Sequence, residues 1–396
     1  VRWGPMKLLL CHNHYRQQGG EDHVFLAEAA LLESHGHDVV RYTVHNDSIG
    51  DGSRLRLAVD TFWNRESYRH LRRLIRQQRP DVVHFYNTFP LLSPSVYYAA
   101  RAEACPVVQS LHNYRLLCSN ALLYRQGRVC EDCLGKLVPW NGVLHGCYRD
   151  DRAASAAVAS MLVGHRLLGT WKRTVDAYVA GMTDFARRKF VDAGIPEDRL
   201  TLKPNFVFPD PGEGDGSGQY ALFVGRFAAE KGVELLVEAW SRLPEGTPLK
   251  IIGDGPLASV IERAAKRHPG IEWLGRRSLD ETYEVLKRAA FLVFPSHWYE
   301  ALPRIIVDSF AVGTPVLAAQ VGAMRDLIHD GCDGLHFRPG DASHLAERSA
   351  WLFSHGNELS RLRSGARAQY LEFYTAERNY ELIMDVYRKA MAGHAR

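Results

Sequence analysis

The chain lacks long hydrophobic stretches: none of its apolar runs approaches the roughly 20 residues that span a bilayer. The first apolar segment, residues 7–11, is too short for the core of a secretory signal peptide. We therefore expect a cytoplasmic protein. Internal repeats and low-complexity tracts are also missing, which excludes repeat architectures. The remaining composition, 396 residues with 46% hydrophobic and 24% charged, is typical of a globular protein with two or three domains.

The chain also has little excess charge, and a net charge of +4 gives no reason to expect a nucleic acid partner. Positive charge gathers at residues 68–79, where five arginines surround apolar residues at helical spacing. The plain interpretation is a solvated surface helix. The other is an interfacial helix that binds anionic lipid through Arg69, Arg72, Arg73 and Arg76, which would place the protein peripherally at the inner face of the cell membrane.

A complete dinucleotide-binding fingerprint is missing as well. Gly253 and Gly255 follow an apolar strand, but Ala258 occupies the position of the last glycine, which argues against a dinucleotide-dependent oxidoreductase. The two glycines would still let the backbone approach a ligand closely, although a bare turn is the alternative.

What the sequence does contain is an alternation of short apolar strands with amphipathic helices, interrupted only by turn-forming residues at 209–218. This pattern predicts an α/β protein with two Rossmann-like, doubly wound parallel-sheet domains and a substrate cleft between them. The expected parts are an acceptor-side domain at 1–208 with an insertion at 113–150, a linker at 209–218, a nucleotide-sugar domain at 219–375 and a final helix at 376–396.

Charged residues follow two of the predicted strands in the second domain. Arg226 and Lys231 lie in the loop after strand 220–224, where cations and backbone N–H groups suit a diphosphate. Glu300 lies in the loop after strand 291–294, and Asp308 is expected about two turns along the next helix. In a parallel sheet both acids would face one crevice. The alternative is a helix-capping Glu300 and a solvated Asp308.

These motifs, in this order, resemble the Gly-Arg-x4-Lys-Gly loop and the acid-x7-acid signature of retaining glycosyltransferases of family 4, which have the GT-B fold. The family usually has two glutamates, whereas Asp308 is one methylene shorter. The resemblance implies transfer of a sugar from a UDP- or GDP-linked donor to a glycan or lipid-linked acceptor hydroxyl, in cell-envelope or exopolysaccharide synthesis. It implies no metal or other cofactor for catalysis, and a final helix that crosses back onto the first domain.

The resemblance also assigns roles to single residues. Arg226 and Lys231 would hold the leaving diphosphate, Glu300 the donor sugar and Asp308 the ribose. The remaining family positions would be Ala301 and Leu302 at the phosphate, Gly19 and Gly20 between donor phosphate and acceptor, His112 over the donor sugar, and Asn205 as a structural or cleft-lining residue. By themselves, the glycine pair would equally be a plain turn and His112 a core histidine.

Four of the seven cysteines, Cys118, Cys130, Cys133 and Cys147, lie in the insertion with the spacing C-x11-C-x2-C-x13-C. One C-x2-C pair is present where a zinc ribbon has two. Four thiolates would hold a structural zinc tetrahedrally, and plain buried thiols or disulfides are the alternatives. Cys11, Cys105 and Cys332 are expected in strands or the core.

Two other functions stay open. A sugar-nucleotide epimerase or hydrolase on the same scaffold would act without an acceptor, so products formed from the donor alone would reveal it. A non-catalytic sugar-nucleotide-binding protein is kept open by the shortened Asp308, and the variant Glu300→Gln separates a binder from a catalyst.

Overall fold

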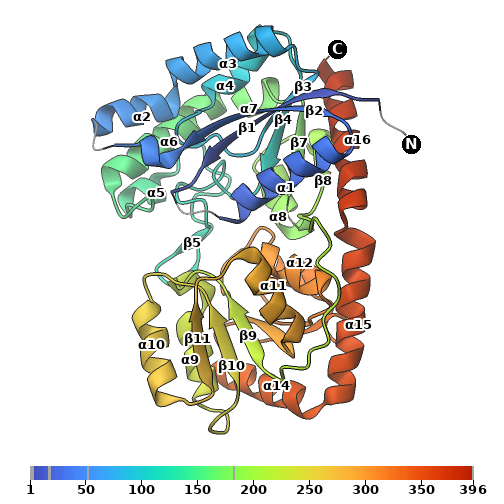
Figure 1. Cartoon of the computed structure of the whole chain (residues 1–396). Helices are drawn as coiled ribbons and strands as arrows, with labels where there is room; N and C mark the ends of the chain where they lie inside the picture. Colours follow the sequence, from blue (N-terminus) through green and yellow to red (C-terminus); the bar gives the residue numbers. More distant parts are fainter. Residues whose placement is uncertain (1–3, 17–18, 51–52, 182, 395–396) are drawn as a thin grey trace. The chain divides into compact units, whose positions relative to one another are not determined.

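The computed structural model describes residues 4–16, 19–50, 53–181 and 183–394, and its contacts divide the chain into two units (Figure 1). The first unit comprises Val1–Leu123, Cys130–Asn205 and Glu377–Arg396. The second unit comprises Tyr124–Val129 and Phe206–Ala376. No helix in the described ranges is both long and apolar enough to cross a bilayer.

A six-stranded parallel sheet with the order β2-β1-β3-β4-β7-β8 forms the centre of the first unit. Its strands are β1 Lys7–His14, β2 Asp38–His45, β3 Val82–Phe85, β4 Val107–Leu111, β7 Ala177–Ala180 and β8 Leu200–Leu202. Its helices are α1 Gly20–Ser34, α2 Arg54–Phe62, α3 Arg65–Gln78, α4 Ser95–Ala102, α5 Trp140–Leu144, α6 Arg152–Leu167, α7 Thr170–Arg173, α8 Asp184–Asp192 and nearly all of α16 Ala376–His394. The direction of strand addition reverses between β1 and β3, which is where ligands bind in open parallel sheets.

The second unit has a parallel sheet with the order β11-β10-β9-β12-β13-β14. The strands are β9 Ala221–Val224, β10 Leu249–Ile252, β11 Ile271–Gly275, β12 Phe291–Phe294, β13 Val316–Ala319 and β14 Gly334–Phe337, and a small hairpin joins β5 Tyr124–Arg125 to β6 Arg128–Val129. The helices are α9 Val233–Trp240, α10 Ala258–Arg267, α11 Leu279–Arg288, α12 Arg304–Ala311, α13 Met324–Leu327, α14 Ala342–Ser354 and α15 Gly356–Phe373. Here the reversal lies between β9 and β12.

The order of strand addition also decides which face of the second sheet each helix covers. Because parallel crossovers are right-handed, helices that follow strands added in opposite directions lie on opposite faces. Thus α9 and α10 share a buried core with α14 on one face, whereas α11 packs on α12 (Figure 1). The prediction of two Rossmann-like parallel-sheet domains is confirmed. The predicted cleft between them stays a prediction.

The boundaries differ from those expected. The expected linker at 209–218 is held by the second unit: Gly214 N donates to Val312 O, and Asp210 forms an ion pair with Arg367. The hairpin Tyr124–Val129 groups with the second unit, so the insertion does not lie wholly in the first. The turn-forming composition correctly predicted that 209–218 has no helix or strand. The segment is nevertheless held against the second unit by backbone hydrogen bonds.

The last helix, α16, packs on the first unit from Glu377 onward. Tyr380 Oη lies 2.8 Å from His37 Nε2, and Tyr387 Oη lies 3.0 Å from His84 Nδ1. These buried polar contacts join the end of the chain to the strands near its start, so the C-terminal helix is part of the first unit's core.

Candidate functional site

The sheet reversal in the second unit brings together two loops that carry charged residues. Lys231, after β9, donates from Nζ to Glu300 Oε1 at 2.5 Å, and Glu300 follows β12. Ser296 Oγ and Trp298 Nε1 donate to the same oxygen at 2.8 Å each. Glu300 is only 7% exposed. The acid and the ammonium group, which belong to separate sequence motifs, therefore meet at one point.

A glycine allows the two loops to approach this closely. Gly232 adopts φ +71°, and a Cβ atom there would lie 2.2 Å from the carbonyl oxygen of Pro295. An L side chain would therefore have to push the Lys231 loop away from the loop that carries Glu300. The glycine after Lys231 is required by the contact between the loops.

The second cation of the predicted pair occupies a different environment. Arg226 Nη2 lies 2.5 Å from Glu230 Oε1, and the Arg226 side chain is 56% exposed. Lys231 is partly buried and bound to Glu300, whereas Arg226 reaches solvent. The two cations look equivalent in the sequence, but only Lys231 contacts the predicted catalytic acid.

Gly253 and Gly255 lie where β10 ends. Both have positive φ, and Cβ atoms would lie 1.9 Å from Gly225 O and 2.6 Å from Phe227 O, respectively. The close approach that these glycines permit is thus to the neighbouring loop of the protein itself. Ala301 and Leu302, also predicted at the phosphate, are buried between Glu300 and the start of α12.

Asp308 is buried, so the alternative of a solvated Asp308 is wrong. It lies about one turn into α12, not two, because the helix begins at Arg304. Tyr283 Oη donates to Asp308 Oδ1 at 2.8 Å, and Arg304 Nε lies 3.4 Å from the same atom. Burial lowers the pKa of Arg304, but the charges of Asp308 and Tyr283 raise it overall. Sequence reasoning missed Tyr283 and Arg304, together with Ser296 and Trp298 at Glu300.

In the first unit, His112 follows β4 and is partly buried. Burial, followed by the charges of Lys203 and His12, lowers the pKa of His112 to about 3, so its ring is neutral at pH 7. The ring stacks on Tyr86 with centroids 6.2 Å apart. Its Nε2 atom is buried and has no hydrogen-bond partner within the described part of the chain. A neutral imidazole with a free nitrogen is suited to hydrogen-bond a ligand.

Gly181→Ala tests the placement of His112. A Cβ atom at residue 181 would lie 2.7 Å from Cε1 and Nδ1 of His112, so we expect the ring to move. If His112 contacts the reacting sugar, a shift of about 1 Å lowers kcat by roughly 10- to 100-fold. Gly356→Ala, where a Cβ atom meets nothing within 4 Å, is the matched control. Unchanged kcat in a Gly181→Ala variant with a native melting temperature would contradict a role for His112.

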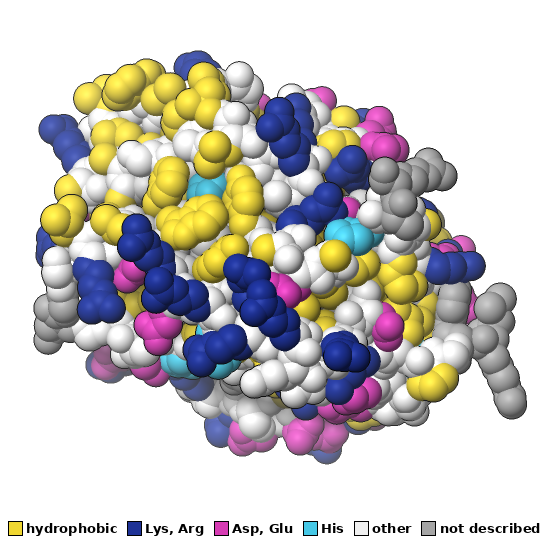
Figure 2. Space-filling view, turned by 90° about the horizontal axis from the view of Figure 1, so that it is seen from above, with side chains coloured by type: hydrophobic (Ala, Val, Ile, Leu, Met, Phe, Trp, Pro, Cys, Tyr) yellow, Lys and Arg dark blue, Asp and Glu magenta, His cyan; other side chains and the backbone are white. Residues whose placement is uncertain are grey.

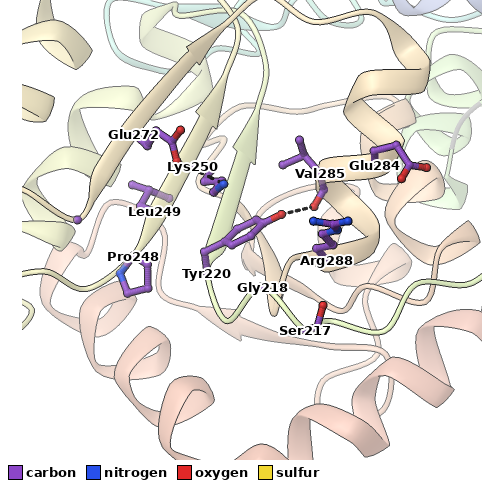
Figure 3. Close-up of a pocket in the computed structure, with 11 residues that line it drawn as sticks. Ser217, Gly218, Tyr220, Pro248, Leu249, Lys250, Glu272, Glu284, Val285 and Arg288 are labelled. Carbon is purple, nitrogen blue, oxygen red and sulfur yellow. Dashed lines mark hydrogen bonds and ion pairs between the residues drawn. The ribbon is translucent and has the colours of Figure 1, made fainter.

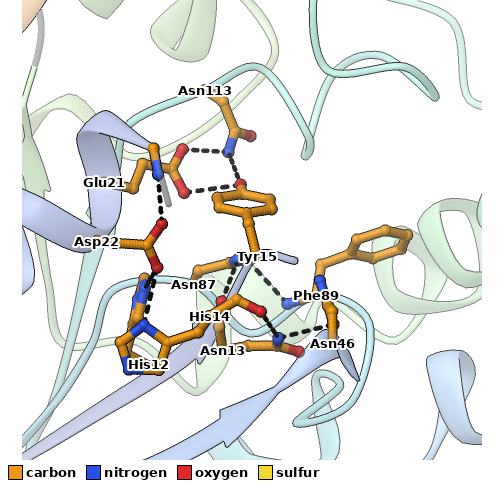
Figure 4. Close-up of polar contacts among 11 residues, drawn as sticks. His12, Asn13, His14, Tyr15, Glu21, Asp22, Asn46, Asn87, Phe89 and Asn113 are labelled. Carbon is orange, nitrogen blue, oxygen red and sulfur yellow. Dashed lines mark hydrogen bonds and ion pairs between the residues drawn. The ribbon is translucent and has the colours of Figure 1, made fainter. Parts of the chain in front are cut away.

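At the reversal between β1 and β3, Asp22 binds two histidines (Figure 4). Its Oδ1 lies 2.9 Å from His12 Nε2 and 2.8 Å from His14 Nδ1, and its Oδ2 accepts a bond from Gly19 N at 2.7 Å. Burial alone would raise the pKa of Asp22, but the bonds from His12, Gly19 and His14 lower it to about 2. The carboxylate is ionised at neutral pH, so each ring nitrogen that faces it carries a proton.

A second polar group lies next to this cluster (Figure 4). Glu21 accepts hydrogen bonds from Tyr15 Oη at 2.8 Å and from Asn113 Nδ2 at 2.6 Å, and burial raises the pKa of Glu21. Gly20 begins α1, and a Cβ atom there would meet nothing within 4 Å. Gly19 serves as the N-cap through its amide, while Gln17 and Gln18 of the same loop lie outside the described residues. Asn205 is buried and is the last residue of the segment Cys130–Asn205 of the first unit.

Among the described side chains, one group of three potential metal ligands has all its ligand atoms within 4.8 Å: His12, His14 and Asp22. Their distances are those of two imidazole N–H groups bound to one carboxylate. Within the described residues, the four insertion cysteines do not form such a group. None of the seven cysteines, all of which lie in the described ranges, forms a disulfide bond, and Cys332 is exposed, against its expected place in a strand or the core.

The insertion cysteines nevertheless lie in one region. Gly142 is central to it: an added Cβ atom would lie 3.9 Å from Cys133 Sγ, and the Cys147 amide donates to Gly142 O. Burial raises the pKa of Cys133, the Gly142 amide opposes this, and the charges of Cys118 and Cys130 raise it further. Cys118 Sγ is turned toward Asn120 Oδ1 at 2.9 Å.

The second unit also has a surface pocket of about 660 Å³ away from the charged loops (Figure 3). Tyr220, Lys250, Glu272, Glu284 and Arg288 line it, and Tyr220 Oη donates to Val285 O at 2.7 Å. Its lining comes from Tyr220, just before β9, and from the amino ends of β10 and β11, whereas Lys231 and Glu300 follow carboxyl ends. The pocket therefore lies at the end of the sheet opposite to the site.

Both halves of the chain match families of known proteins. The family model "Glycosyl transferases group 1" matches residues 211–369, and the model "Glycosyl transferase 4-like domain" matches residues 19–205. An uncharacterized glycosyltransferase of Methanocaldococcus jannaschii is 34% identical over 136 residues, which is 34% of this chain and 38% of that protein. The sulfoquinovosyl transferase SQD2 of Arabidopsis thaliana is 27% identical over 206 residues, 50% of this chain and 39% of that protein. The matched regions thus span under two-fifths of the length of these relatives.

Solved structures show the same fold over nearly the whole chain. The crystal structure of Anabaena Alr3699/HepE in complex with UDP has a TM-score of 0.67 at 16% identity and covers 96% of this chain and 99% of that one. Such a low identity establishes the fold alone. The family models supply the rest: together they match most of the two units, and the chain belongs to the glycosyltransferases of the group 1 and 4-like families, with the GT-B fold.

Proposed function

We propose that the chain is a retaining glycosyltransferase that moves a sugar from a nucleoside diphosphate donor to an acceptor hydroxyl. The observation that carries the proposal is the contact between Lys231 and Glu300 at the sheet reversal of the second unit. An ammonium group and a carboxylate enclosed together suit a donor with an anionic leaving group beside sugar hydroxyls. Structures of Anabaena Alr3699/HepE with UDP and with UDP-glucose share the fold.

In the proposed reaction, the bond between the sugar C1 and the diphosphate oxygen breaks while the acceptor oxygen bonds to C1 on the same face. The acceptor proton passes to the leaving diphosphate oxygen. Lys231, with Arg226 at the exposed side, would stabilise the charge on that oxygen, so the step needs no metal ion. Three donors converge on Oε1 of Glu300, so a sugar hydroxyl would approach Oε2.

The remaining residues take roles from the same proposal. Asp308, held by Tyr283 and Arg304, would face the ribose. The neutral His112 would hydrogen-bond the donor sugar through Nε2. Gly19 and Gly20 would allow donor phosphate and acceptor to approach α1, where His14 is the partly exposed member of the Asp22 cluster. The acceptor would be a glycan or a lipid-linked hydroxyl of the cell envelope or an exopolysaccharide.

The test is a screen of UDP- and GDP-linked sugars for release of nucleoside diphosphate, with and without candidate acceptors. We expect one donor class to stabilise the protein thermally and to be consumed faster when an acceptor hydroxyl is present. The configuration at C1 of the product reports retention. Turnover of the donor alone to an epimer or a free sugar would favour the epimerase or hydrolase alternative. Inversion at C1 would contradict the proposed mechanism.

We also propose that Cys118, Cys130, Cys133 and Cys147 hold a structural zinc ion, supported by their spacing and their shared region around Gly142. Cys118 would have to turn from Asn120 to join it. Metal analysis is expected to find about one zinc per chain. Cys130→Ser with Cys133→Ser should lose the metal and lower the melting temperature, whereas Cys332→Ser should do neither. If the purified protein holds no metal and these four cysteines all react as thiols, they are plain cysteines.

A further inference from the structure

The arginine side chains of α3 lie in two different environments. Arg72 Nε and Arg76 Nε donate to the two carboxylate oxygens of Glu103, just after α4, at 2.5 and 2.8 Å. The sequence grouped Arg69, Arg72, Arg73 and Arg76 as one lipid-binding set. In the structure Arg72 and Arg76 are instead engaged by a carboxylate of the same unit, while the lipid contact of the set stays a prediction.

The other arginines of α3 belong to a groove. Arg65, Arg69 and Arg73 are exposed and follow one another at i, i+4 and i+8, so they share one side of the helix. With Arg56, Val59 and Trp63 from α2 and its end, they line a cavity of about 500 Å³. Two acids also line it, of which Asp60 lies 3.6 Å from Arg56. Four guanidinium groups against two carboxylates give the groove a positive balance.

An exposed apolar surface lies on the neighbouring elements. Seven of the twelve large hydrophobic side chains exposed among the described residues belong to it: Leu55, Val59, Leu137, Trp140, Leu144, Leu167 and Leu168. Leu55 is 75% and Trp140 70% exposed. Figure 2 shows hydrophobic side chains gathered on one face, with Lys and Arg side chains beside them.

Contacts within the unit join the elements that carry these side chains. Both α2 and α5 pack on α6. Phe62 O, at the end of α2, lies 2.9 Å from His165 Nε2 of α6. Arg166 donates to Leu137 O at 3.1 Å, which joins the segment before α5 to the end of α6. We call Leu55, Val59, Leu137, Trp140, Leu144, Leu167 and Leu168 the apolar face, and it meets the arginine groove at Val59.

We propose that the arginine groove and the apolar face together bind the surface of an anionic phospholipid membrane. Guanidinium groups match phosphate oxygens in charge and geometry. Exposed leucines with a tryptophan beside arginines are the composition of interfacial segments, which insert apolar side chains between headgroups. Val59 belongs to both, so acyl chains and headgroup phosphates would meet the protein side by side there. The inference goes beyond the proposed sugar transfer and does not require it.

Flotation of the whole chain with vesicles tests the proposal. We expect binding to vesicles of phosphatidylcholine mixed with phosphatidylglycerol, and much weaker binding to phosphatidylcholine alone. The triple variant Arg65→Ser, Arg69→Ser and Arg73→Ser should weaken binding about 100-fold, as expected for three cations at an anionic surface. The matched control is Arg263→Ser, Lys266→Ser and Arg267→Ser on α10, which removes the same charge from exposed positions of the other unit. The control should bind as the parent does.

The apolar face has its own variant, Leu55→Ser with Trp140→Ser, which should lower vesicle binding while leaving the salt dependence unchanged. If the α3 and α10 triple variants lose vesicle binding equally, the binding depends only on net charge, and the proposal is overturned. Binding of inorganic phosphate without binding of vesicles would identify a free anion site and overturn it as well. So would a dimer that Trp140→Ser dissociates, because a second copy of the chain would then cover the apolar face.

Discussion

Replacing Lys231 with methionine is expected to lower kcat/KM for glycosyl transfer by about 10³-fold, the loss typical of removing a preorganised group that stabilises developing charge. Lys231 is the cation that contacts Glu300 directly, and its ammonium group also lies 5.4 Å from the ring of Trp298. Methionine retains the apolar stem but removes the charge. Most of the loss should appear in kcat, because charge grows on the leaving oxygen as the bond breaks.

The control for this variant is Lys250→Met, at the opposite end of the same sheet, where the ammonium group lies 4.6 Å from the ring of Tyr220. It changes net charge equally and should leave turnover within about twofold, in line with a surface substitution. Steady-state rates with the donor identified by the screen are the measurement. If Lys231→Met retains turnover within tenfold of the parent, Lys231 does not stabilise the leaving group.

The variant Glu300→Gln should lower kcat by about 10²- to 10³-fold, with a smaller change in the donor dissociation constant. The amide has nearly the same shape, but only its oxygen can accept a hydrogen bond. Lys231, Ser296 and Trp298 all donate to Oε1, so the amide oxygen must take that position and its NH2 group must replace Oε2. An NH2 group cannot accept a bond from a sugar hydroxyl.

Glu284→Gln on α11, which lines the pocket of Figure 3, is the control because it makes the same change away from the charged loops. Calorimetry separates donor affinity from turnover, and thermal melting shows whether the fold is kept. A Glu300→Gln variant that loses donor affinity only, from a parent that shows no turnover, would indicate a protein that binds the donor without catalysing transfer. Unchanged turnover in this variant would show that Glu300 has no role in the reaction.

Much of the fold could be predicted because it depends on contiguous residues. Strands such as β3 and β12 are buried along their whole length, so they read as apolar runs between polar helices. The strand order was harder to predict. That β9 lies between β10 and β12 follows from long-range packing, and this placement is what joins the Lys231 loop to the Glu300 loop.

The candidate site shows the same division. Glu300 and Asp308 were recognised from their motif, but a solvated Asp308 stayed open as the alternative because its partner Tyr283 lies on the preceding helix, 25 positions earlier. The sequence does not distinguish Arg226 from Lys231. In the structure, Gly232 lies against Pro295, so the loop approaches the Glu300 loop next to Lys231. The basic helix was recognised as well, yet its arginines could not be sorted without Glu103, which lies after a different helix.

The amino-acid order alone determined two parallel α/β domains and the loops that bear Lys231, Glu300 and His112, because hydrophobic periodicity and loop position are local properties of a chain. Only the tertiary structure decided which of these groups touch. It bound Lys231 to Glu300, surrounded Asp308 with Tyr283 and Arg304, and left an arginine groove beside an apolar face. Each of these outcomes depends on side chains from separate elements, and local spacing does not specify which distant partner a side chain will meet.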